Sequence, residues 1–287
     1  MRIRLREKLA NTLSPRTLRG VYSSFDLIGD IAIIKTPADN IEAEEAIAKQ
    51  ILATHQGVKT VLSPTSPVKG EHRIRNLKLL GGEDKTVTKY KESGCIFSVD
   101  VEKCYFSPRL SYERKRIATQ VLPGETIVNM FSGVGCFSII IAKTVPKTIV
   151  HSIDINPVAY EYMIENIRLN RVYGKVYPIL GDSKIMIQKL EHTVDRILMP
   201  LPEKALEYLP AAVSALKKRG GWIHYYDFEH AVGAEDPREK TEQKVAQALD
   251  IVGVRYIFAH SRIIRSTGPN WYQTVLDIQV AALPSKF

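Results

Sequence analysis

Two glycines and one acidic residue stand at the spacing of a nucleoside-binding loop. The segment Thr126 to Asn156 reads TIVNMFSGVGCFSIIIAKTVPKTIVHSIDIN, in which an apolar run meets Gly133 and Gly135 and a second apolar run stops at Asp154. Glycine lets backbone N–H groups approach a bound molecule, and an acid that closes the second strand can accept both hydroxyls of a ribose. The segment therefore predicts a nucleoside cofactor. It is not the dinucleotide fingerprint, because a third glycine is missing.

Apolar periodicity predicts the elements that must position this loop. Strands and helices alternate, which is typical of an α/β fold with a largely parallel sheet. Asn156 and Pro157 should begin a helix as its N-cap and first residue. The last two apolar runs are close enough to pair antiparallel and complete seven strands. The predicted strands are 126–131, a run ending at 154, 177–180, 195–199, 222–226, 254–259 and 272–281, and the helices include 136–143, 203–218 and 237–252.

Polar residues end three of these strands. They are Ser132 to Gly135, Asp154, and the Asp182-Ser183 pair. Because the carboxyl ends of parallel strands meet at one edge of a sheet, these residues should converge on one crevice, with Asp154 on the ribose and Asp182-Ser183 near an adenine edge. A tight turn is the alternative for the glycines, and a helix cap is the alternative for Asp182.

The chain before this unit has a different pattern and predicts a small α+β domain. We expect a basic helix over residues 1–20 with a break or new start at Ser14-Pro15, a strand over 25–35 with a turn at Gly29-Asp30, and a helix over 41–55. Short strand runs follow at 58–62, 77–80, 86–90 and 95–99. The pattern changes near Glu102, so we predict domains over 1–102 and 103–287.

The charge of the chain favours a polyanionic partner. Its formal net charge is +9 and its pI is near 9.3. Clustered basic residues attract nucleic acid, although a solvated basic face is the simpler alternative. Two segments carry the excess: Arg2, Arg4, Arg6, Lys8, Arg16 and Arg19, and then Lys59, Lys69, Arg73, Arg75, Lys78, Lys85, Lys89 and Lys91.

Composition excludes several other classes of protein. The apolar fraction of 45% and charged fraction of 25% are those of a globular protein, and no apolar run is long enough to span a bilayer. The N-terminal segment has no signal-peptide pattern, so we expect a cytoplasmic protein without a membrane partner. The cysteines Cys95, Cys104 and Cys136 are odd in number and lack metal-ligand spacing, so we expect neither a disulfide nor a metal site.

Several segments resemble one enzyme family. The segment YFSPRL (105–110) with Glu113-Arg114 after it, and the segments VNMFSGVGCFSI, SIDINP, DRILMPLP and GGWIHYYDF, are similar to archaeal and eukaryotic tRNA (guanine-37-N1)-methyltransferases and their wyosine-pathway relatives. The resemblance runs from about Phe25 to the C-terminus. It implies a class I methyltransferase, with a Rossmann-like seven-stranded sheet and a smaller N-terminal α+β domain. It also implies S-adenosyl-L-methionine as cofactor, the anticodon loop of tRNA as partner, and a monomer.

The resemblance assigns the chemistry to Glu113 and Arg73. In the family this glutamate is regarded as the general base that takes the N1 proton of guanine, whose delocalised lone pair cannot attack a methyl group without a positioned carboxylate. An arginine of the smaller domain is thought to contact guanine O6, and the segment EHRIRNL places it at Arg73 rather than Arg75. Spacing alone favours a helix-surface glutamate paired with Arg109 or Arg116.

Other residues match family positions that bind substrate or cofactor. Tyr105 and Arg109 would position the flipped base and its phosphate, with core packing as the alternative for Tyr105. Pro200, Leu201 and Pro202 would meet the edge of the base. The cofactor contacts would be Arg114, Phe131, Ser132, Gly133, Gly135, Asp154, Ile155, Asn156, Asp182 and Ser183.

Three features depart from the family pattern. Pro200 replaces an asparagine that holds the guanine edge, and it offers a carbonyl but neither an amide side chain nor an N–H. A proline here resembles some wyosine-pathway members. Asn129 replaces an acid in the first strand, which weakens a contact to the methionine amine. From the resemblance we also expect the sequence to begin after the domain that grips the outer corner of tRNA in archaeal members, and so we expect affinity to depend on the two basic segments.

Three functions compete on this basis. The first is methyl transfer to N1 of guanosine 37 in tRNA. The second is a wyosine-pathway reaction at the same position, either C7-methylation of the tricyclic base or aminocarboxypropyl transfer. The third is a non-catalytic tRNA-binding protein. Two further groups are weaker candidates. His224-Tyr225-Tyr226 would end the fifth strand and line the pocket, with a packed strand end as the favoured alternative. Arg262, Arg265 and Trp271-Tyr272 would contact RNA, with a place in the sheet as the alternative for Trp271 and Tyr272.

Overall fold

The structure is a computed structural model that describes residues 5–37, 40–68 and 70–283. The chain forms two compact units, Met1–Ser111 (unit 1) and Tyr112–Phe287 (unit 2). The domain boundary after Glu102 stays a prediction. Arg2, Arg4 and Lys69 lie outside the described residues. Within the described ranges, none of the helices has both the length and the apolar character that crossing a membrane requires.

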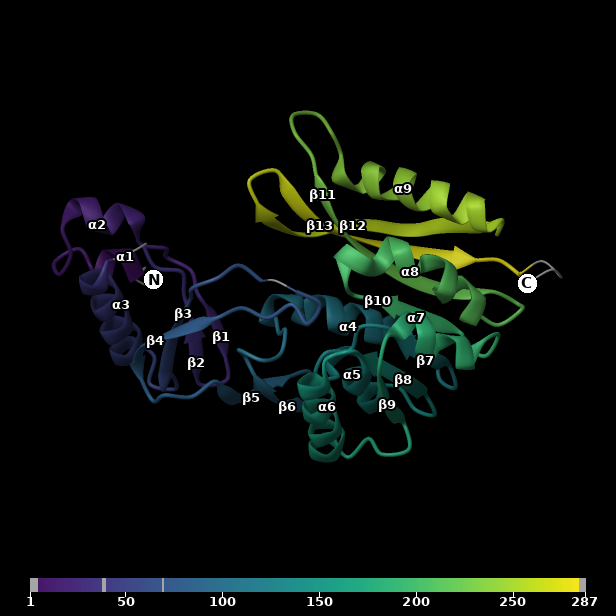
Figure 1. Cartoon of the computed structure of the whole chain (residues 1–287), viewed down its shortest axis with the longest axis horizontal. Coiled ribbons are helices and arrows are strands. Elements are labelled where there is room, and N and C mark those ends of the chain that lie inside the picture. The colour runs from purple at the N-terminus through teal and green to yellow at the C-terminus, as the bar shows by residue number, and fades with distance from the viewer. Residues whose placement is uncertain (1–4, 38–39, 69, 284–287) are drawn as a thin grey trace. The chain divides into compact units, whose positions relative to one another are not determined.

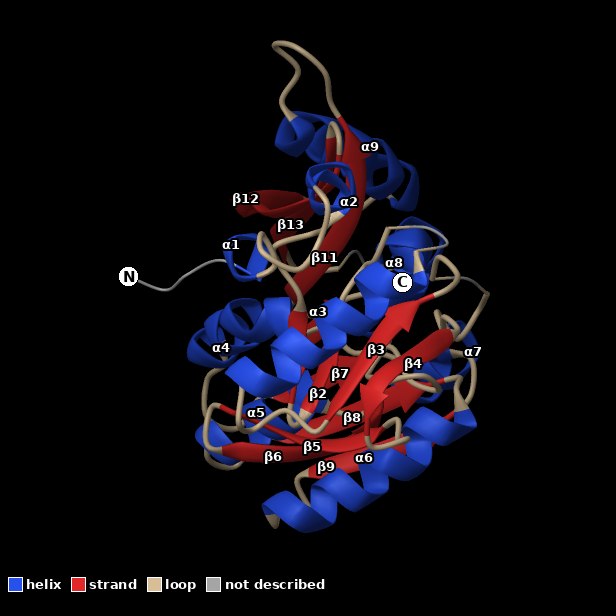
Figure 2. Ribbon diagram, turned by 90° about the vertical axis from the view of Figure 1, so that its left-hand side faces the viewer, coloured by secondary structure: helices blue, strands red, loops and turns tan. Residues whose placement is uncertain are grey.

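Unit 1 contains a four-stranded sheet with the order β1-β2-β3-β4. Helix α3 packs against β3 and β4 (Figure 2) and buries the apolar stripe Ala43, Ile47, Ala48 and Ile51. The helices are α1 (Leu5–Lys8), α2 (Pro15–Gly20) and α3 (Ile41–Thr54). The strands are β1 (Asp26–Ile28), β2 (Ile31–Ile33), β3 (Thr60–Pro64) and β4 (Leu77–Gly82).

The break or new helix start that the sequence predicted at Ser14-Pro15 is confirmed, and the described part of the basic segment forms two short helices, α1 and α2, rather than one. Ser14 caps a new helix, since its side chain accepts a hydrogen bond from the Thr17 N–H, and Pro15 occupies the first helical position. Arg6 has a structural role in addition to its charge. Its guanidinium donates a hydrogen bond to the Val21 carbonyl oxygen at 2.6 Å, which joins α1 to the end of α2.

A turn and a hairpin complete unit 1. The turn expected at Gly29-Asp30 separates β1 from β2, which pair antiparallel. Gly29 has a φ of +58°, and a Cβ there would lie 2.2 Å from the Thr88 hydroxyl, so the position needs glycine. Strands β5 (Val87–Glu92) and β6 (Cys95–Asp100) form a two-stranded sheet, and the short 3₁₀ helix η1 (Pro108–Leu110) follows.

Unit 2 confirms the α/β fold with a seven-stranded sheet. The strand order is β12-β13-β11-β10-β7-β8-β9, in which β7 to β11 are parallel and β13 is antiparallel to both β11 and β12 (Figure 1). The strands are β7 (Thr126–Asn129), β8 (Ile149–Asp154), β9 (Val176–Leu180), β10 (Arg196–Met199), β11 (Gly221–His230), β12 (Tyr256–Gly268) and β13 (Trp271–Val280).

Strand β11 is longer than the sequence predicted. The apolar run suggested an end at Tyr226, but the strand continues to His230. Its parallel partner β10 reaches only Tyr225, whereas β13 pairs with β11 over its whole length, from Gly221–Val280 to His230–Trp271. A strand lasts as long as a neighbour satisfies its backbone groups, and the partner here comes from 41 or more residues away in sequence.

The helices of unit 2 follow their sequence signals closely. Asn156 caps α6 by accepting from the Val158 N–H at 3.0 Å, and Pro157 is the first helical residue, as predicted. Helices α8 and α9 pack side by side along β11. The helices are α4 (Ser111–Gln120), α5 (Cys136–Thr144), α6 (Pro157–Asn170), α7 (Ser183–Met186), the 3₁₀ helix η2 (Ile187–Leu190), α8 (Pro202–Ala215) and α9 (Pro237–Val252).

Candidate active site

The glycine loop joins β7 to α5 in a conformation that requires glycine. Gly133 has a φ of +54°, and Gly135, the N-cap of α5, has a φ of +91°. A Cβ on Gly135 would lie 3.0 Å from Ile139 Cδ1 and 3.1 Å from Met163 Cγ, so a side chain there would be crowded as well as strained by the positive φ. Glycine at these two positions therefore lets the backbone make the turn between β7 and α5.

Asp154 ties the ends of three strands together. Its carboxylate accepts hydrogen bonds from the Gly133 N–H at 2.5 Å and the Asn156 N–H at 2.9 Å. Its own carbonyl oxygen accepts from the Gly181 N–H at 3.0 Å. The polar ends of β7, β8 and β9 thus come together at the same edge of the sheet, as their positions in the sequence predicted. Phe131, Ser132 and Ile155 belong to the same connected loops.

Asp182 and Ser183 lie at the third of these strand ends. Asp182 caps α7 through the Lys184 N–H at 2.7 Å, which is the alternative that the sequence left open, and its other oxygen accepts from the Tyr208 hydroxyl at 3.0 Å. The Tyr208 ring contacts the Phe131 ring, with centroids 5.4 Å apart. The Ser183 hydroxyl is buried and has no hydrogen-bond partner within the structure as described, so it can serve a bound ligand.

Asn129 has a structural role at the end of β7. It is fully buried, its side-chain amide donates to the Ser138 hydroxyl at 3.2 Å, and its oxygen lies 3.4 Å from the Phe131 N–H. These contacts tie the end of β7 to α5. The expected loss of a contact to the cofactor's methionine amine stays a prediction.

Glu113 is a buried carboxylate, with a relative exposure of 1%. Arg116 donates to both of its oxygens, at 2.9, 3.1 and 2.6 Å. Arg262 donates to Oε2 at 3.0 Å, and the Tyr226 hydroxyl donates to Oε1 at 2.9 Å. A buried carboxylate is costly unless it is paired in this way. The pairing with Arg116 that spacing favoured is present, but in the interior rather than on a helix surface.

The contacts of Glu113 continue into a chain of buried side chains. Arg116 also donates to Asp277, at 2.5 and 3.1 Å, and Asp277 accepts from His224 Nδ1 at 2.6 Å. His224 Nε2 lies 2.7 Å from the Arg196 guanidinium, which donates to Glu125 at 2.7 Å. We call these residues the buried charge network: Glu113, Arg116, Asp277, His224, Arg196 and Glu125, with Tyr226 and Arg262 bound to Glu113.

Electrostatics fix the protonation states in this network. Burial would raise the pKa of Asp277, but hydrogen bonds from His224 and Arg116 outweigh it and hold the pKa well below its usual range. Burial lowers the pKa of His224, and the Asp277 carboxylate opposes this only in part. Burial and the negative charge of Glu113 raise the pKa of Tyr226. Asp277 is therefore ionised, and His224 and Tyr226 are neutral, near pH 7.

Tyr226 connects Glu113 to the glycine loop. Its ring packs against the Phe137 ring, with centroids 6.2 Å apart, and Phe137 lies in the first turn of α5, directly after the loop. The packing expected for His224-Tyr225-Tyr226 is confirmed, because all three residues are buried, but they lie inside β11 rather than at its end. Arg262 and Tyr226 are contacts of Glu113 that the sequence did not predict, and no local signal points to them.

Arg73, Tyr105 and Arg109 belong to unit 1. The Arg73 guanidinium lies over the Tyr105 ring, 4.5 Å from its centroid, and Arg73 has a φ of +53°, which is uncommon for a residue with a side chain. Arg109 is exposed and pairs with Asp26 at 2.7 Å. Glu113 lies in unit 2, so its meeting with Arg73 at a flipped base stays a prediction.

Other predicted site residues lie in unit 2. Arg114 is buried, with 3% exposure. Strand β10 ends at Met199, and Pro202 is the first residue of α8 with Leu201 as an N-cap whose side chain makes no capping bond. Pro200 and Leu201 are partly exposed. Within the ranges described, no three His, Cys, Asp or Glu side chains cluster as metal ligands would.

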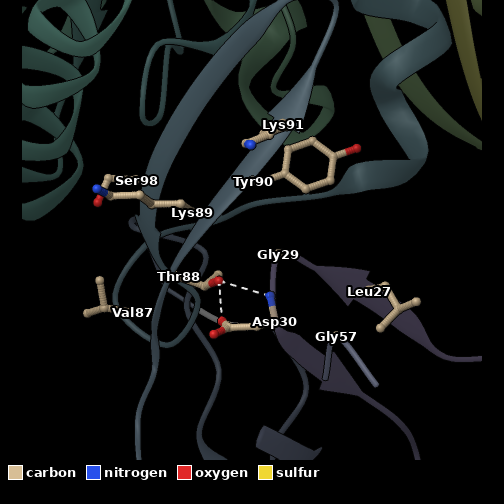
Figure 3. Close-up of a pocket in the computed structure, with 10 residues that line it drawn as sticks. All are labelled: Leu27, Gly29, Asp30, Gly57, Val87, Thr88, Lys89, Tyr90, Lys91 and Ser98. Atoms are coloured by element: carbon tan, nitrogen blue, oxygen red, sulfur yellow. Dashed lines mark hydrogen bonds between the residues drawn. The ribbon is translucent and has the colours of Figure 1, made fainter. Parts of the chain in front are cut away.

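A groove of about 750 Å³ runs along β5 in unit 1. Figure 3 shows its lining, where Asp30 is fixed by Thr88 at 2.6 Å beneath Lys89 and Tyr90. Three other lysines of the second basic segment pair with acids: Lys59 with Glu83 at 3.8 Å, Lys78 with Glu44 at 2.6 Å and Lys85 with Asp30 at 2.7 Å. Lys89 and Lys91 are exposed and have no acidic partner among the described residues, so the groove carries uncompensated positive charge.

Comparison with known proteins shows which protein family the chain is related to. Two protein-family models match the chain. The model described as "TRM5/TYW2 methyltransferase domain" matches residues 88–252, and the model described as "TYW2 N-terminal domain" matches residues 5–86. The tRNA (guanine(37)-N(1))-methyltransferase Trm5b of Pyrococcus abyssi is 40% identical over 93% of this chain and 78% of its own length. The tRNA 4-demethylwyosine(37)-methyltransferase Taw21 of Saccharolobus solfataricus is 40% identical over 90% of this chain and 94% of its own length.

Solved structures agree with this relationship. The structure described as the complex of aTrm5 and tRNALeu has a TM-score of 0.83 and 31% identity, over 97% of this chain and 78% of that one. The TYW2 of P. horikoshii in complex with MeSAdo has a TM-score of 0.77 and 30% identity, over 97% of this chain and 98% of that one. The sequence and the fold together show that the chain belongs to the TRM5/TYW2 methyltransferase family.

Proposed function

We propose that this protein transfers the methyl group of S-adenosylmethionine to N1 of guanosine 37 in the anticodon loop of tRNA. One observation carries the proposal: the buried Glu113 carboxylate is joined through Tyr226 to Phe137, in the helix that starts at the glycine loop. A candidate base is thereby held at a defined place relative to the candidate cofactor loop. The relatives named as tRNA (guanine(37)-N(1))-methyltransferases support the same reaction.

The residues at the ends of β7, β8 and β9 fit the cofactor. Gly133 and Gly135 give the loop the positive φ angles that favour glycine, and the buried Ser183 hydroxyl lacks a partner among the described residues. A carboxylate has about four acceptor positions, so Asp154 can accept ribose hydroxyls in addition to backbone N–H groups. Phe131, Ser132, Ile155, Asn156, Asp182 and Arg114 complete the proposed contacts. When bound, S-adenosylmethionine supplies a methyl group on a positively charged sulfur.

Glu113 performs the proton transfer in the proposed reaction. A Glu113 oxygen would take the N1 proton of guanine, and the electron pair of the broken N–H bond would stay on N1, which could then accept the methyl group that the cofactor supplies. Tyr226 and Arg116 hold the carboxylate during this step. General base catalysis of this kind contributes about 10²- to 10⁴-fold in rate.

Unit 1 and the loop after β10 supply the proposed substrate contacts. The guanidinium of Arg73, stacked on Tyr105, would donate to guanine O6, where negative charge grows as N1 loses its proton. Arg109 would release its ion-pair partner Asp26 and bind a phosphate of the flipped nucleotide instead. Pro200, Leu201 and Pro202 would border the base. Lys89 and Lys91 would meet the RNA backbone. A cytoplasmic monomer stays our expectation.

Pro200 favours a second candidate reaction, C7-methylation of the tricyclic 4-demethylwyosine at the same position. A proline cannot hold the guanine edge with an amide, which loosens selection for the plain base. The Saccharolobus relative named for this reaction is covered almost completely by the chain. Aminocarboxypropyl transfer is the other wyosine-pathway reaction, and one relative of Methanocaldococcus jannaschii at 32% identity is named for it.

Nucleoside analysis distinguishes these reactions. The protein is incubated with S-adenosylmethionine and either unmodified tRNA or tRNA that carries 4-demethylwyosine, and the digested nucleosides are weighed by mass spectrometry. We expect 1-methylguanosine at position 37, lost in Glu113→Ala and retained in Glu161→Ala, which removes an exposed glutamate of α6. A methylated tricycle without 1-methylguanosine would select the second reaction. Binding of tRNA without any product and without cofactor binding would favour the non-catalytic tRNA-binding protein.

A further inference from the structure

Arg116 is held on two edges by two different carboxylates. Its Nε and one terminal nitrogen donate to Glu113, while both terminal nitrogens donate to Asp277, at 2.5 and 3.1 Å. A guanidinium is planar and its five N–H groups have fixed directions, so contacts on two edges fix its plane. The orientation of Glu113 therefore depends on a carboxylate that does not touch it.

Asp277 is fixed in turn by groups from two other elements. Gln120 of α4 donates to Oδ2 at 3.1 Å, and His224 of β11 lies 2.6 Å from Oδ1 through Nδ1. Arg196 can only donate, so the 2.7 Å contact with His224 Nε2 makes that nitrogen an acceptor. The imidazole proton must then be on Nδ1, where it is donated to Asp277. The acid has no freedom to turn away from Arg116.

The charges of the network balance while Glu113 is ionised. The acids Glu113, Asp277 and Glu125 face the guanidinium groups of Arg116, Arg262 and Arg196, and His224 is neutral. When Glu113 takes a proton, Arg116 still faces the ionised Asp277. Without Asp277, Glu113 would be the closest counter-ion of Arg116, and a carboxylate held in that way is a weaker base.

We infer that Asp277 is a positioning residue for proton abstraction, which acts through Arg116 to aim the Glu113 carboxylate and to compensate the charge of Arg116 while Glu113 is protonated. The inference rests on the proposed function and deepens it. Glu113 faces Arg116 from α4, Tyr226 from β11 and Arg262 from β12, while Asp277 on β13 reaches it only through Arg116.

The pH profile of single-turnover methyl transfer tests this role. Asp277→Asn keeps the shape of the side chain and removes its charge, so kcat should fall about 10- to 100-fold, the value of a hydrogen bond to a charged group. The KM values for tRNA and cofactor should stay unchanged, and the acid limb of the profile should move to lower pH. Arg262→Gln removes a cation from Glu113 and should move the limb to higher pH. Asp227→Asn, which breaks the ion pair with Lys244, should leave the limb in place.

Two outcomes would overturn the inference. One is an acid limb that does not move in Asp277→Asn. The other is a double variant Asp277→Asn with Arg116→Gln that loses more activity than Arg116→Gln alone, because an acid that acts only through Arg116 has no effect once Arg116 is gone. If Asp277→Asn does not fold, Arg116→Lys keeps the charge but not the fork, and unchanged kcat in that variant would also contradict the inference.

A structural measurement separates this inference from the proposed function. A crystal structure of Asp277→Asn should show the Arg116 guanidinium rotated and the Glu113 carboxylate displaced from the Tyr226 hydroxyl. An unmoved Glu113 overturns the positioning role even if the enzyme methylates tRNA. If instead wild-type protein makes no methylated nucleoside at position 37, the proposed function fails, while the displaced carboxylate would still support the positioning of Glu113 by Asp277.

Discussion

Two carboxylates of unit 2, Asp154 and Glu113, are held in opposite ways. Asp154 accepts from backbone N–H groups that lie 2 and 21 residues away in sequence. Glu113 accepts from side chains, and those of Tyr226 and Arg262 lie 113 and 149 residues away. Backbone donors follow from a local turn, whereas side-chain donors depend on the packing of several strands. The first carboxylate is suited to hold a ligand, and the second is suited to have its proton affinity tuned.

The largest effect is expected at Glu113. Glu113→Gln keeps the volume but cannot accept a proton, so single-turnover methyl transfer should fall about 10²- to 10⁴-fold. Arg116 and Arg262 would lose a buried counter-ion, and breaking such a pair typically costs about 3–5 kcal/mol in the free energy of unfolding. Denaturant titration measures the second effect. Full activity in a folded Glu113→Gln protein would remove Glu113 from the mechanism.

Asp154→Ala should give the next largest effect, and this effect should be on cofactor affinity rather than on the rate of methyl transfer. Each ribose hydrogen bond to a carboxylate is worth about 1.5–3 kcal/mol, so the affinity for S-adenosylmethionine should fall about 100-fold while the affinity for tRNA stays nearly unchanged. Calorimetry with each ligand measures both. Asp84→Ala, an exposed acid of unit 1, is the matched control. An equal loss of both affinities would contradict the crevice at the strand ends.

The contrast between backbone donors near a turn and side-chain donors from distant strands also explains which features the sequence could predict. The glycine loop, the N-cap at Asn156 and the acid at Asp154 are signals within one β-loop-α-β unit, and their convergence was predicted because strand ends of a parallel sheet share an edge. The antiparallel pairing of the last two strands was predicted from their spacing, and it is confirmed. These features depend on short-range geometry.

The surroundings of Glu113 could not be predicted in this way. The sequence offers Arg116 as a neighbour at i+3, but nothing local indicates that Asp277 binds the other edge of its guanidinium. That contact depends on the register in which β13 pairs with β11, where His224 lies opposite Asp277. A slip of β13 by one residue would turn Asp277 to the other face of the sheet, away from His224. The extension of β11 beyond Tyr226 was missed for the same reason.

Unlike the two carboxylates, the surface lysines Lys89 and Lys91 of unit 1 have no acidic partner among the described residues. Replacing Lys89 and Lys91 with alanine should lower tRNA affinity about tenfold and reduce the slope of log K against log salt concentration by about 1.4, since each phosphate of a single strand contributes about 0.7. Lys59→Ala is the control, because Lys59 already pairs with Glu83. Filter binding at several salt concentrations measures the slope. An unchanged slope would place the RNA backbone away from this groove.

The smallest effect that we expect is on the pH dependence of the free energy of unfolding, to which the histidines His224 and His151 contribute. Burial lowers the pKa of His224 below its ordinary value of 6.5, so the unfolded chain binds a proton that the folded protein does not. The stability that depends on the neutral imidazole is therefore complete above about pH 6.5 and is lost as the pH falls below it, with a slope of at most about 1.4 kcal/mol per pH unit. His224→Gln should flatten this part of the curve.

His151 provides the matching measurement beside Asp154. It lies on β8, stacks on Tyr177, and its pKa is lowered by burial alone, but it is only partly buried. His151→Gln should therefore flatten the stability curve less than His224→Gln does, when both are followed by urea unfolding between pH 5 and 8 on either side of the ordinary histidine value of about 6.5. If the two variants changed the curve equally, the distinction would fail, because solvent would then reach the buried charge network as easily as it reaches His151 on β8.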